Sequence, residues 1–323
     1  MRMILGIVLS ALSALGASAG ATAQEYPTKP IRFIVPFAPG AGTDMIARTI
    51  AQRLNEAWGH PVVVDHRPGG TGAVGSMVVA QAAPDGYTMM MVTSSTHAIA
   101  PNLHRKPPYD PVKDFAPVSL AASAPEIVVA HSSVPVASIK DVVALAKAKP
   151  GVLNYASSGT GTIGHMTGEL FKLVTGANIV HIPYKGAGAA IREVLGGQVQ
   201  LMFSAPAAVI PHVRSGKLRA LAAATRERLP ELKEIPTLAE LGYPAVEASN
   251  WYGVLVPAGT PRAIVDKLNR EIVRTMQLPE VKEALFRQGY NATHSTPEQF
   301  GKLIRDDLAK WKKVVKASGM ELD

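Results

Sequence analysis

The sequence predicts an α/β protein of two lobes with a ligand cleft between them. Three observations lead to this prediction. Short β-branched runs alternate with helical patterns, which is typical of parallel α/β layering. The alternation stops at a proline-rich surface loop over 101–111 and then restarts. Without a predicted export signal over 1–23, the chain keeps 300 of its 323 residues (323 − 23), enough for two lobes of ordinary size.

The two units are read from their hydrophobic periodicity. In the first, Ile46, Ile50, Leu54 and Trp58 recur every four residues and indicate a helix with one buried face. There we expect strands over 31–36, 61–65 and 87–92, and helices over 44–58 and 72–83. In the second unit we expect strands over 127–130, 153–156, 179–182, 199–203 and 218–223, and helices over 138–149, 162–174 and 187–195.

The last third contains one more strand, over 251–256, and is otherwise helical. Thr260-Pro261 and Thr296-Pro297 each predict an N-cap followed by proline at the first helical position. Gln299 completes a capping box with Thr296. The final helix carries one apolar stripe, formed by Phe300, Leu303, Ile304, Leu308, Trp311 and Val315.

This last segment has too little sheet to form a third domain, so we expect it to return to the first lobe. Lobe 1 then comprises residues 24–125 and 245–323, and lobe 2 comprises 126–244. The crossovers are expected near 123–127 and 243–250. Two lobes joined by more than one strand form a hinge, and small ligands usually bind between domains.

The N-terminus has the features of a cleaved export signal. Arg2 is the positive end, 4–14 is a short apolar run, and Ala21-Thr22-Ala23 is an A-x-A cleavage pattern. The apolar run is too short to span a bilayer, which takes about 20 residues. The chain has no cysteine, which excludes disulfides, thiolate metal sites and a thiol-linked lipid anchor. We expect a soluble periplasmic protein, not a lipoprotein, and a monomer.

The charge balance favours anionic ligands only weakly. Removing Arg2 from the 33 basic residues leaves 32 against 25 acidic residues, a net charge of +7. The cations are scattered, and the densest run, Lys310, Lys312, Lys313 and Lys316, fits the solvated face of a helix. Export and the few interleaved aromatic residues argue against nucleic acid as a partner.

Two glycine turns are the main candidate ligand site. The first runs Phe37-Ala38-Pro39-Gly40-Ala41-Gly42-Thr43-Asp44, from a strand into a helix that Thr43 or Asp44 can cap. The second runs Ser157-Ser158-Gly159-Thr160-Gly161-Thr162 and leads into the helix that carries His165. Unpaired N–H groups at each helix start favour an anion. If the lobes face each other, both helix starts point into one cleft, which suits a dicarboxylate or a carboxylate with a second polar group.

Other strand ends contribute polar candidates. These are Ser94, Ser95 and Thr96 after one strand, Tyr184 and Lys185 after another, and Ser204 after a third. A serine-rich turn that satisfies itself and a solvated lysine are the alternatives at these positions. Apart from Asp44, the loops carry no carboxylate, so an ammonium on the ligand would lack a counter-charge. We therefore expect an acid without a free amine.

The same glycines also fit a dinucleotide fingerprint, but weakly. Gly159, Gly161 and Gly164 spell G-x-G-x-x-G after a strand, and so do Gly70, Gly72 and Gly75. A dinucleotide site also needs an acidic residue at the end of the next strand, and neither match has one. We expect no cofactor.

Taken together, these motifs resemble the tripartite tricarboxylate transporter receptors, the Bug family of periplasmic solute-binding proteins. The likeness runs from Tyr26-Pro27 to the final helix and is carried by several motifs. They are 34–40 with Asp44, 64–70, 84–87, 157–161 with His165, 183–186 and 213–221.

The resemblance implies a two-lobed, type II-like periplasmic-binding-protein fold that closes on its ligand. It also implies that the loops at 40–44 and 157–162 grip a carboxylate, often through ordered water, and that a membrane permease receives it. Ala41 stands where many relatives have glycine, and Ser204 and Ala205 lie in a variable stretch, so ligand identity does not transfer.

Three other function classes were weighed. A hydrolase needs a nucleophile, a base and an orienting acid, and the sequence has no cysteine and no G-x-S-x-G elbow. A metal carrier needs clustered ligands, and the nine histidines are scattered. A sensor that signals through a membrane partner fits the sequence as well as an uptake receptor does.

Overall fold

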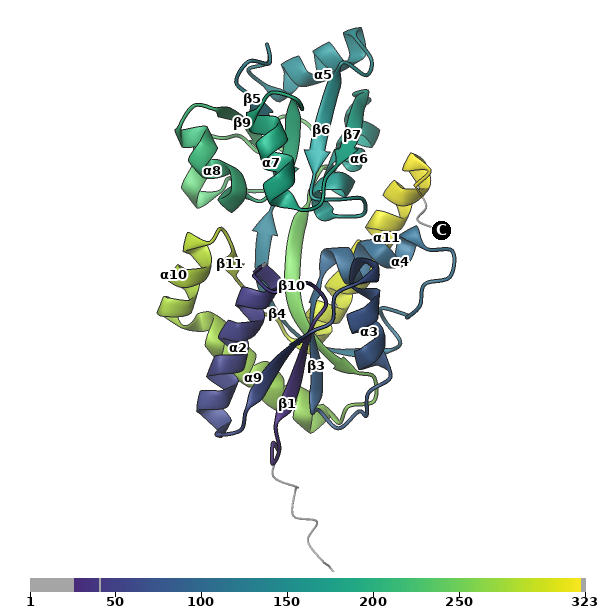
Figure 1. Ribbon diagram of the computed structural model, residues 1–323, viewed down its shortest axis with the longest axis vertical. Helices are drawn as coiled ribbons and strands as arrows, with labels where there is room; N and C mark the ends of the chain where they lie inside the picture. Colours follow the sequence, from purple (N-terminus) through teal and green to yellow (C-terminus); the bar gives the residue numbers. More distant parts are fainter. Residues whose placement is uncertain (1–25, 41, 321–323) are drawn as a thin grey trace, which may run out of the picture.

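Two separate sheets organise the chain into two α/β lobes (Figure 1). The computed structural model describes residues 26–40 and 42–320. The predicted export signal over 1–23 and Ala41 of the first glycine turn lie outside these residues. No helix among the described residues has the length and apolar character needed to cross a bilayer.

Lobe 1 is built on a six-stranded mixed sheet in the order β11-β4-β10-β3-β1-β2. Its strands are β1 (Ile31–Val35), β2 (Val62–His66), β3 (Thr88–Thr93), β4 (Phe115–Pro125), β10 (Ser249–Pro257) and β11 (Asn291–Ala292). Its helical segments are α2 (Gly42–Trp58), η1 (Gly70–Gly72), α3 (Ala73–Ala80), η2 (Ser95–Ile99), α4 (Ala100–Leu103), α9 (Arg262–Gln277), α10 (Pro279–Arg287) and α11 (Pro297–Ser318). The β1 strand is parallel to β2 and β3, whereas β10 is antiparallel to β3 and β4.

Lobe 2 is built on a five-stranded mixed sheet in the order β7-β6-β8-β5-β9. Its strands are β5 (Ile127–His131), β6 (Leu153–Ser157), β7 (Ile179–Pro183), β8 (Leu201–Ser204) and β9 (Leu218–Ala223). Its helices are α5 (Ile139–Ala148), α6 (Ile163–Thr175), α7 (Ala187–Leu195) and α8 (Pro206–Arg214), and η3 (Pro230–Leu232) follows β9. The carboxyl end of β6 points toward lobe 1, while β1 runs up toward lobe 2 (Figure 1).

Three parts of the expected secondary structure were wrong. The strand β4 was not expected, because Pro117 and a run of small residues hide its pattern; the pairing with β10 is irregular there, between Val254 and Leu255. The helical segments η2, α4 and α8 were also missed, and so was β11, which lies in a part expected to be helical apart from the strand over 251–256. Thr260 does not cap α9: its hydroxyl donates to the carbonyl of Pro257, and the helix begins at Arg262. The capping box of Thr296 and Gln299 is confirmed.

The lobes are joined where two chain segments cross. The first crossing is Glu126, between β4 and β5, and the second leads into β10. The Glu126 N–H donates to the carbonyl of Ala248 (3.1 Å), and the Glu126 carbonyl accepts from the N–H of Ala224 (2.8 Å). Ala248 in turn donates to Ala224 (2.9 Å). These hydrogen bonds hold the crossing segments in one register.

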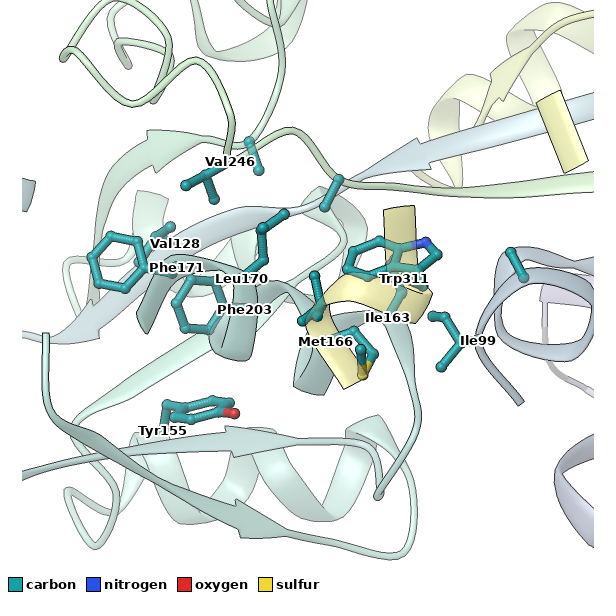
Figure 2. Packing of buried hydrophobic residues seen from close by; sticks show 14 of the residues in the cluster. Ile99, Val128, Tyr155, Ile163, Met166, Leu170, Phe171, Phe203, Val246 and Trp311 are labelled. Carbon is teal, nitrogen blue, oxygen red and sulfur yellow. The ribbon is translucent and has the colours of Figure 1, made fainter. Parts of the chain in front are cut away.

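Apolar packing also connects the lobes on the side of α11. This helix packs against η2 and α4 of lobe 1 and against α6 of lobe 2. Trp311 of α11 is fully buried and packs beside Ile99 of lobe 1 and the α6 residues Ile163 and Met166 of lobe 2 (Figure 2). One hydrophobic cluster therefore continues from one lobe to the other.

Candidate functional site

The first glycine turn uses its acidic residue internally. Asp44 accepts the N–H of Gly40 on Oδ2 (3.0 Å), while Oδ1 lies 2.8 Å from both Nε2 of His66 and Nε of Arg48. Burial alone would raise the pKa of Asp44, but these hydrogen bonds outweigh it and hold that pKa below its ordinary value. Asp44 is therefore an ionised residue that shapes the turn. The helix α2 begins at Gly42, so Thr43 and Asp44 lie inside its first turn instead of capping it.

The second glycine turn also satisfies part of its own backbone. The N–H of Gly159 donates to Oγ of Ser157 (3.2 Å), and that of Thr162 to the carbonyl of Gly159 (3.3 Å). The N–H of Gly161 donates to Nδ1 of His165 (3.1 Å). The expectation that this turn presents bare amides is thus wrong for these three residues, because neighbouring side chains and carbonyls accept them.

Free amides remain one step further, in the first turn of α6. Thr162 is the N-cap, but its hydroxyl donates back to the carbonyl of Gly159 and caps no N–H. Within the part of the chain that the structure describes, the N–H groups of Ile163, Gly164 and His165 have no hydrogen-bond acceptor. Unpaired amides at the positive end of a helix dipole form an anion site.

His165 lies behind the turn and supports it. It is 3% exposed and stacks on His181, with ring centroids 3.7 Å apart and planes 13° from parallel. Nε2 of His181 lies 2.6 Å from Oγ of Ser157. Burial lowers the pKa of His165 to about 4 and that of His181 to about 3, so both rings are neutral at pH 7. A neutral ring is what Nδ1 of His165 needs to accept from Gly161.

The other side of the histidine pair faces a buried acid. Oε1 of Glu169 lies 4.0 Å from Nε2 of His165 and accepts from the hydroxyl of Tyr155 (2.7 Å). Nζ of Lys172 donates to both oxygens of Glu169, at 2.9 and 3.0 Å. This network holds the histidine rings in place, and through the bond of His165 to Gly161 it also supports the glycine turn.

A chain of contacts connects the start of α2 to the start of α6. A Cβ built on Gly42 would lie 2.0 Å from the hydroxyl of Tyr290, so the phenol of Tyr290 covers the first residue of α2. Tyr290 packs edge to face on Tyr252 (ring centroids 5.4 Å apart), and their hydroxyls interact. Glu126 lies close enough to Tyr252 to influence the pKa of its phenol, and Oε2 of Glu126 would lie 3.6 Å from a Cβ on Gly164. A set of polar residues therefore connects the two helix starts, and we call this set the polar floor: Glu126, Tyr252 and Tyr290 with Ser94 and Asn250.

Ser94 and Asn250 complete the floor. The hydroxyl of Ser94 donates to Oδ1 of Asn250, and Nδ2 of Asn250 donates to the hydroxyl of Tyr252, both at 2.7 Å. Ser204 is buried and pairs in register with Ile127, the residue after Glu126. Ser204 therefore lies beside the first crossing segment.

The remaining predicted residues take several roles. Thr96 is fully buried and bonds to Thr93 and His97, so it satisfies its own turn. Ser95 is buried beside it. Tyr184 is half-buried and donates its N–H to the carbonyl of Ser157 (3.1 Å), whereas Lys185 is exposed. The others, Phe37, Ser158 and Thr160, lie in the two turns with partial or full exposure.

Four residues of the floor were not expected from the sequence: Glu126, Asn250, Tyr252 and Tyr290. One signal was available for Glu126, because it is the single acid in an apolar stretch at the expected crossover over 123–127. Among the described residues, no three His, Asp or Glu side chains gather as a metal site.

Comparison with known proteins places the chain in a family. Residues 46–320 match the model of the tripartite tricarboxylate transporter family receptor. The chain belongs to this receptor family. Protein BugT of Bordetella pertussis is 38% identical over 323 residues, covering 100% of this chain and 99% of BugT.

Solved structures of similar proteins share the fold. Rpa4515 of R. palustris with adipate has a TM-score of 0.81 at 35% identity, covering 92% of this chain and 99% of that one. MatC of Rhodopseudomonas palustris with bound malate has a TM-score of 0.78 at 30% identity, covering 90% and 100%. The receptor therefore has the two-lobed fold of periplasmic solute-binding proteins.

Proposed function

We propose that this receptor captures a small carboxylate between its lobes and delivers it to the permease of a tripartite transporter. The observation that carries the proposal is the row of N–H groups at Ile163, Gly164 and His165, without acceptors among the described residues and joined through the polar floor to the start of α2. Relatives with adipate and malate bound support the ligand class. The protein works as a monomer in the periplasm and leaves the ligand unchanged.

The energetics of such a site suffice without a metal. A partly buried helix start contributes up to about 2 kcal/mol to anion binding. Each hydrogen bond to a charged group contributes about 1.5–3 kcal/mol. Micromolar affinity needs about 8 kcal/mol net. Two helix starts and three or four such hydrogen bonds reach this value after the cost of ordering the ligand.

The expected selectivity follows from the charges at the site. Asp44 is occupied by Gly40, His66 and Arg48, so no ionised carboxylate of the two turns is left for an ammonium. The candidate ligand is therefore an acid without a free amine. Chain length and the second polar group of that acid are set by the floor and by Ser204.

A melting-temperature screen tests this function. Purified protein lacking residues 1–23 is heated with succinate, malate, adipate, citrate or benzoate, and with amines and sugars as contrasts. A ligand at 100 times its Kd adds about 2.7 kcal/mol to the free energy of unfolding, a shift on the order of 5 °C for a chain of this size. We expect at least one acid to give such a shift. A shift with amines or sugars and none with any acid contradicts the proposal.

The link to a permease has its own test. Reconstituted membrane vesicles that contain the cognate permease should accumulate the selected radiolabelled acid only when this receptor is added. Equal uptake with and without the receptor would separate ligand binding from transport.

A further inference from the structure

Glu126 is a buried acid at the crossing of the lobes, and one of its carboxyl oxygens has no hydrogen-bond partner among the described residues. Its side chain is 3% exposed, and Oε2 has no hydrogen-bond partner in the described structure. Its backbone N–H and carbonyl are both bonded within the crossing, which fixes the main chain from which the side chain projects. An unpaired buried polar atom is costly, and where it persists a missing partner or a function usually explains it.

The unused oxygen lies at the candidate ligand site. It approaches the first turn of α6, 3.6 Å from where a Cβ of Gly164 would be, and this turn carries the free amides. A side chain at residue 164 would also lie 2.6 Å from the carbonyl of Phe203, so only glycine lets α6 come this close to β8. Oε2 of Glu126 therefore lies beside the first turn of α6.

Among the described residues, no lysine or arginine acts on the pKa of Glu126 to keep it ionised. The titratable group next to it is Tyr252 on β10, which itself packs on Tyr290, and burial raises the pKa of both phenols. On α6 the nearest titratable ring is His165, which is engaged with Gly161. Burial is the sole cause that raises the pKa of Glu126, to about 8. At pH 7 the side chain is a neutral carboxylic acid.

We propose that Glu126 is a specificity residue that donates a hydrogen bond from its carboxylic acid to an oxygen of the bound anion. This inference rests on the proposed function and adds a group to it. A protonated carboxylic acid donates a hydrogen bond and carries no charge that repels an anion beside it. An ionised carboxylate would repel an anionic ligand and attract an ammonium. The role explains why an acid stands in a site that binds acids.

The test measures affinity against pH by calorimetry, using adipate and malate, whose carboxyl groups stay ionised from pH 6 to 9.5. In the unmodified protein we expect a constant Kd up to about pH 7 and then a rise approaching tenfold per pH unit above about pH 8, as the proton is lost. Glu126→Gln keeps a neutral hydrogen-bond donor, so across the whole pH range the Kd of this variant should stay within about threefold of its own value at pH 7. Glu126→Ala should weaken binding about 10- to 100-fold at pH 7.

Two controls keep the outcomes separate. Glu227→Gln changes an exposed acid of lobe 2 and should leave both Kd and its pH dependence unchanged. Melting of each variant without ligand shows whether it folds; if Glu126→Ala does not fold, the pH profile of Glu126→Gln decides. A flat profile in the unmodified protein together with full affinity in Glu126→Ala overturns the inference while leaving the proposed function intact.

Amino acids as ligands test whether Glu126 is instead an ionised carboxylate. Binding of aspartate or glutamate in preference to malate, abolished by Glu126→Gln, would mean that Glu126 is an ionised partner of an ammonium. That outcome also overturns the inference. If no acid binds the unmodified protein at all, it is the proposed function that fails.

Discussion

The N–H of Gly161 donates to Nδ1 of His165 across 3.1 Å, and this bond holds the second glycine turn in a left-handed backbone conformation, with φ of +76° at Gly161. The turn immediately precedes the free amides of α6. The shape of this turn therefore depends on a buried imidazole ring. His165 is a positioning residue for the anion site.

Replacing His165 separates positioning from simple packing. Asparagine places Oδ1 near the position of Nδ1, so His165→Asn should accept from Gly161 and keep ligand affinity within about threefold. His165→Ala loses the acceptor and leaves the N–H unpaired, which should weaken binding about 10-fold or more. Calorimetry with the acid selected by the melting screen measures both. Equal affinity in the two variants would contradict the positioning role.

The stacked histidines also predict acid sensitivity of the fold. Their pKa values are lowered in the folded state, to about 4 for His165 and about 3 for His181, against about 6.5 in the unfolded chain. The unfolded chain therefore binds protons first as the pH falls. Stability is fully present above about pH 6.5 and is lost progressively as the pH drops toward about 3.

Urea unfolding at pH 7 and pH 4.5 measures this loss. His165→Asn removes one of the two groups, so the difference in unfolding free energy between the two pH values should shrink by about 2 kcal/mol. His294→Asn, at an exposed position, serves as the control and should leave the difference unchanged. A pH difference that is the same in all three proteins would show that the buried pair does not carry the effect.

A close approach between the lobes predicts a variant that resists closure. Gly289 in lobe 1 has φ of +78°, and a Cβ built there would lie 2.2 Å from Cβ of Ala207 in α8 of lobe 2. Gly289→Ala should therefore force these elements apart and weaken ligand binding about 10-fold or more, because the closed form is the one that binds.

Gly242 offers a matched control for this variant. It has φ of +91° but no atom within 4 Å of a built Cβ, so Gly242→Ala carries backbone strain without the contact between lobes. Each substitution should cost about 1 kcal/mol of stability from strain. If both variants lose the same affinity, strain and not separation of the lobes is responsible.

Much of the fold could be predicted from local pattern. The helix α2 shows its four-residue periodicity directly, and the capping box at Thr296 fixes the start of α11. The strand β4 could not be found this way, since its small residues and prolines carry no strand signal and its place is set by pairing with β10. The contact of α11 with both lobes is likewise a matter of tertiary packing.

The candidate site divides in the same way. The two glycine turns are local motifs and were predicted from their shared Gly-x-Gly-Thr. Which of their amides stay free was not predictable, because this depends on where Asp44, His165 and Ser157 point. The polar floor joins residues over 150 positions apart, brought together when β10 pairs with β3 and β4. No sequence pattern within a single segment indicates that these residues lie close together in the fold.

In the proposed site, the helix starts of α2 and α6 bind one anion together. The most direct measurement is a nitrogen–proton correlation NMR titration of labelled protein with the acid that gives the largest melting shift. We expect the amide protons of Thr43, from α2, and Gly164, from α6, to move downfield with the same apparent Kd. Unchanged amide signals at both positions, while the acid binds and shifts others, would contradict it.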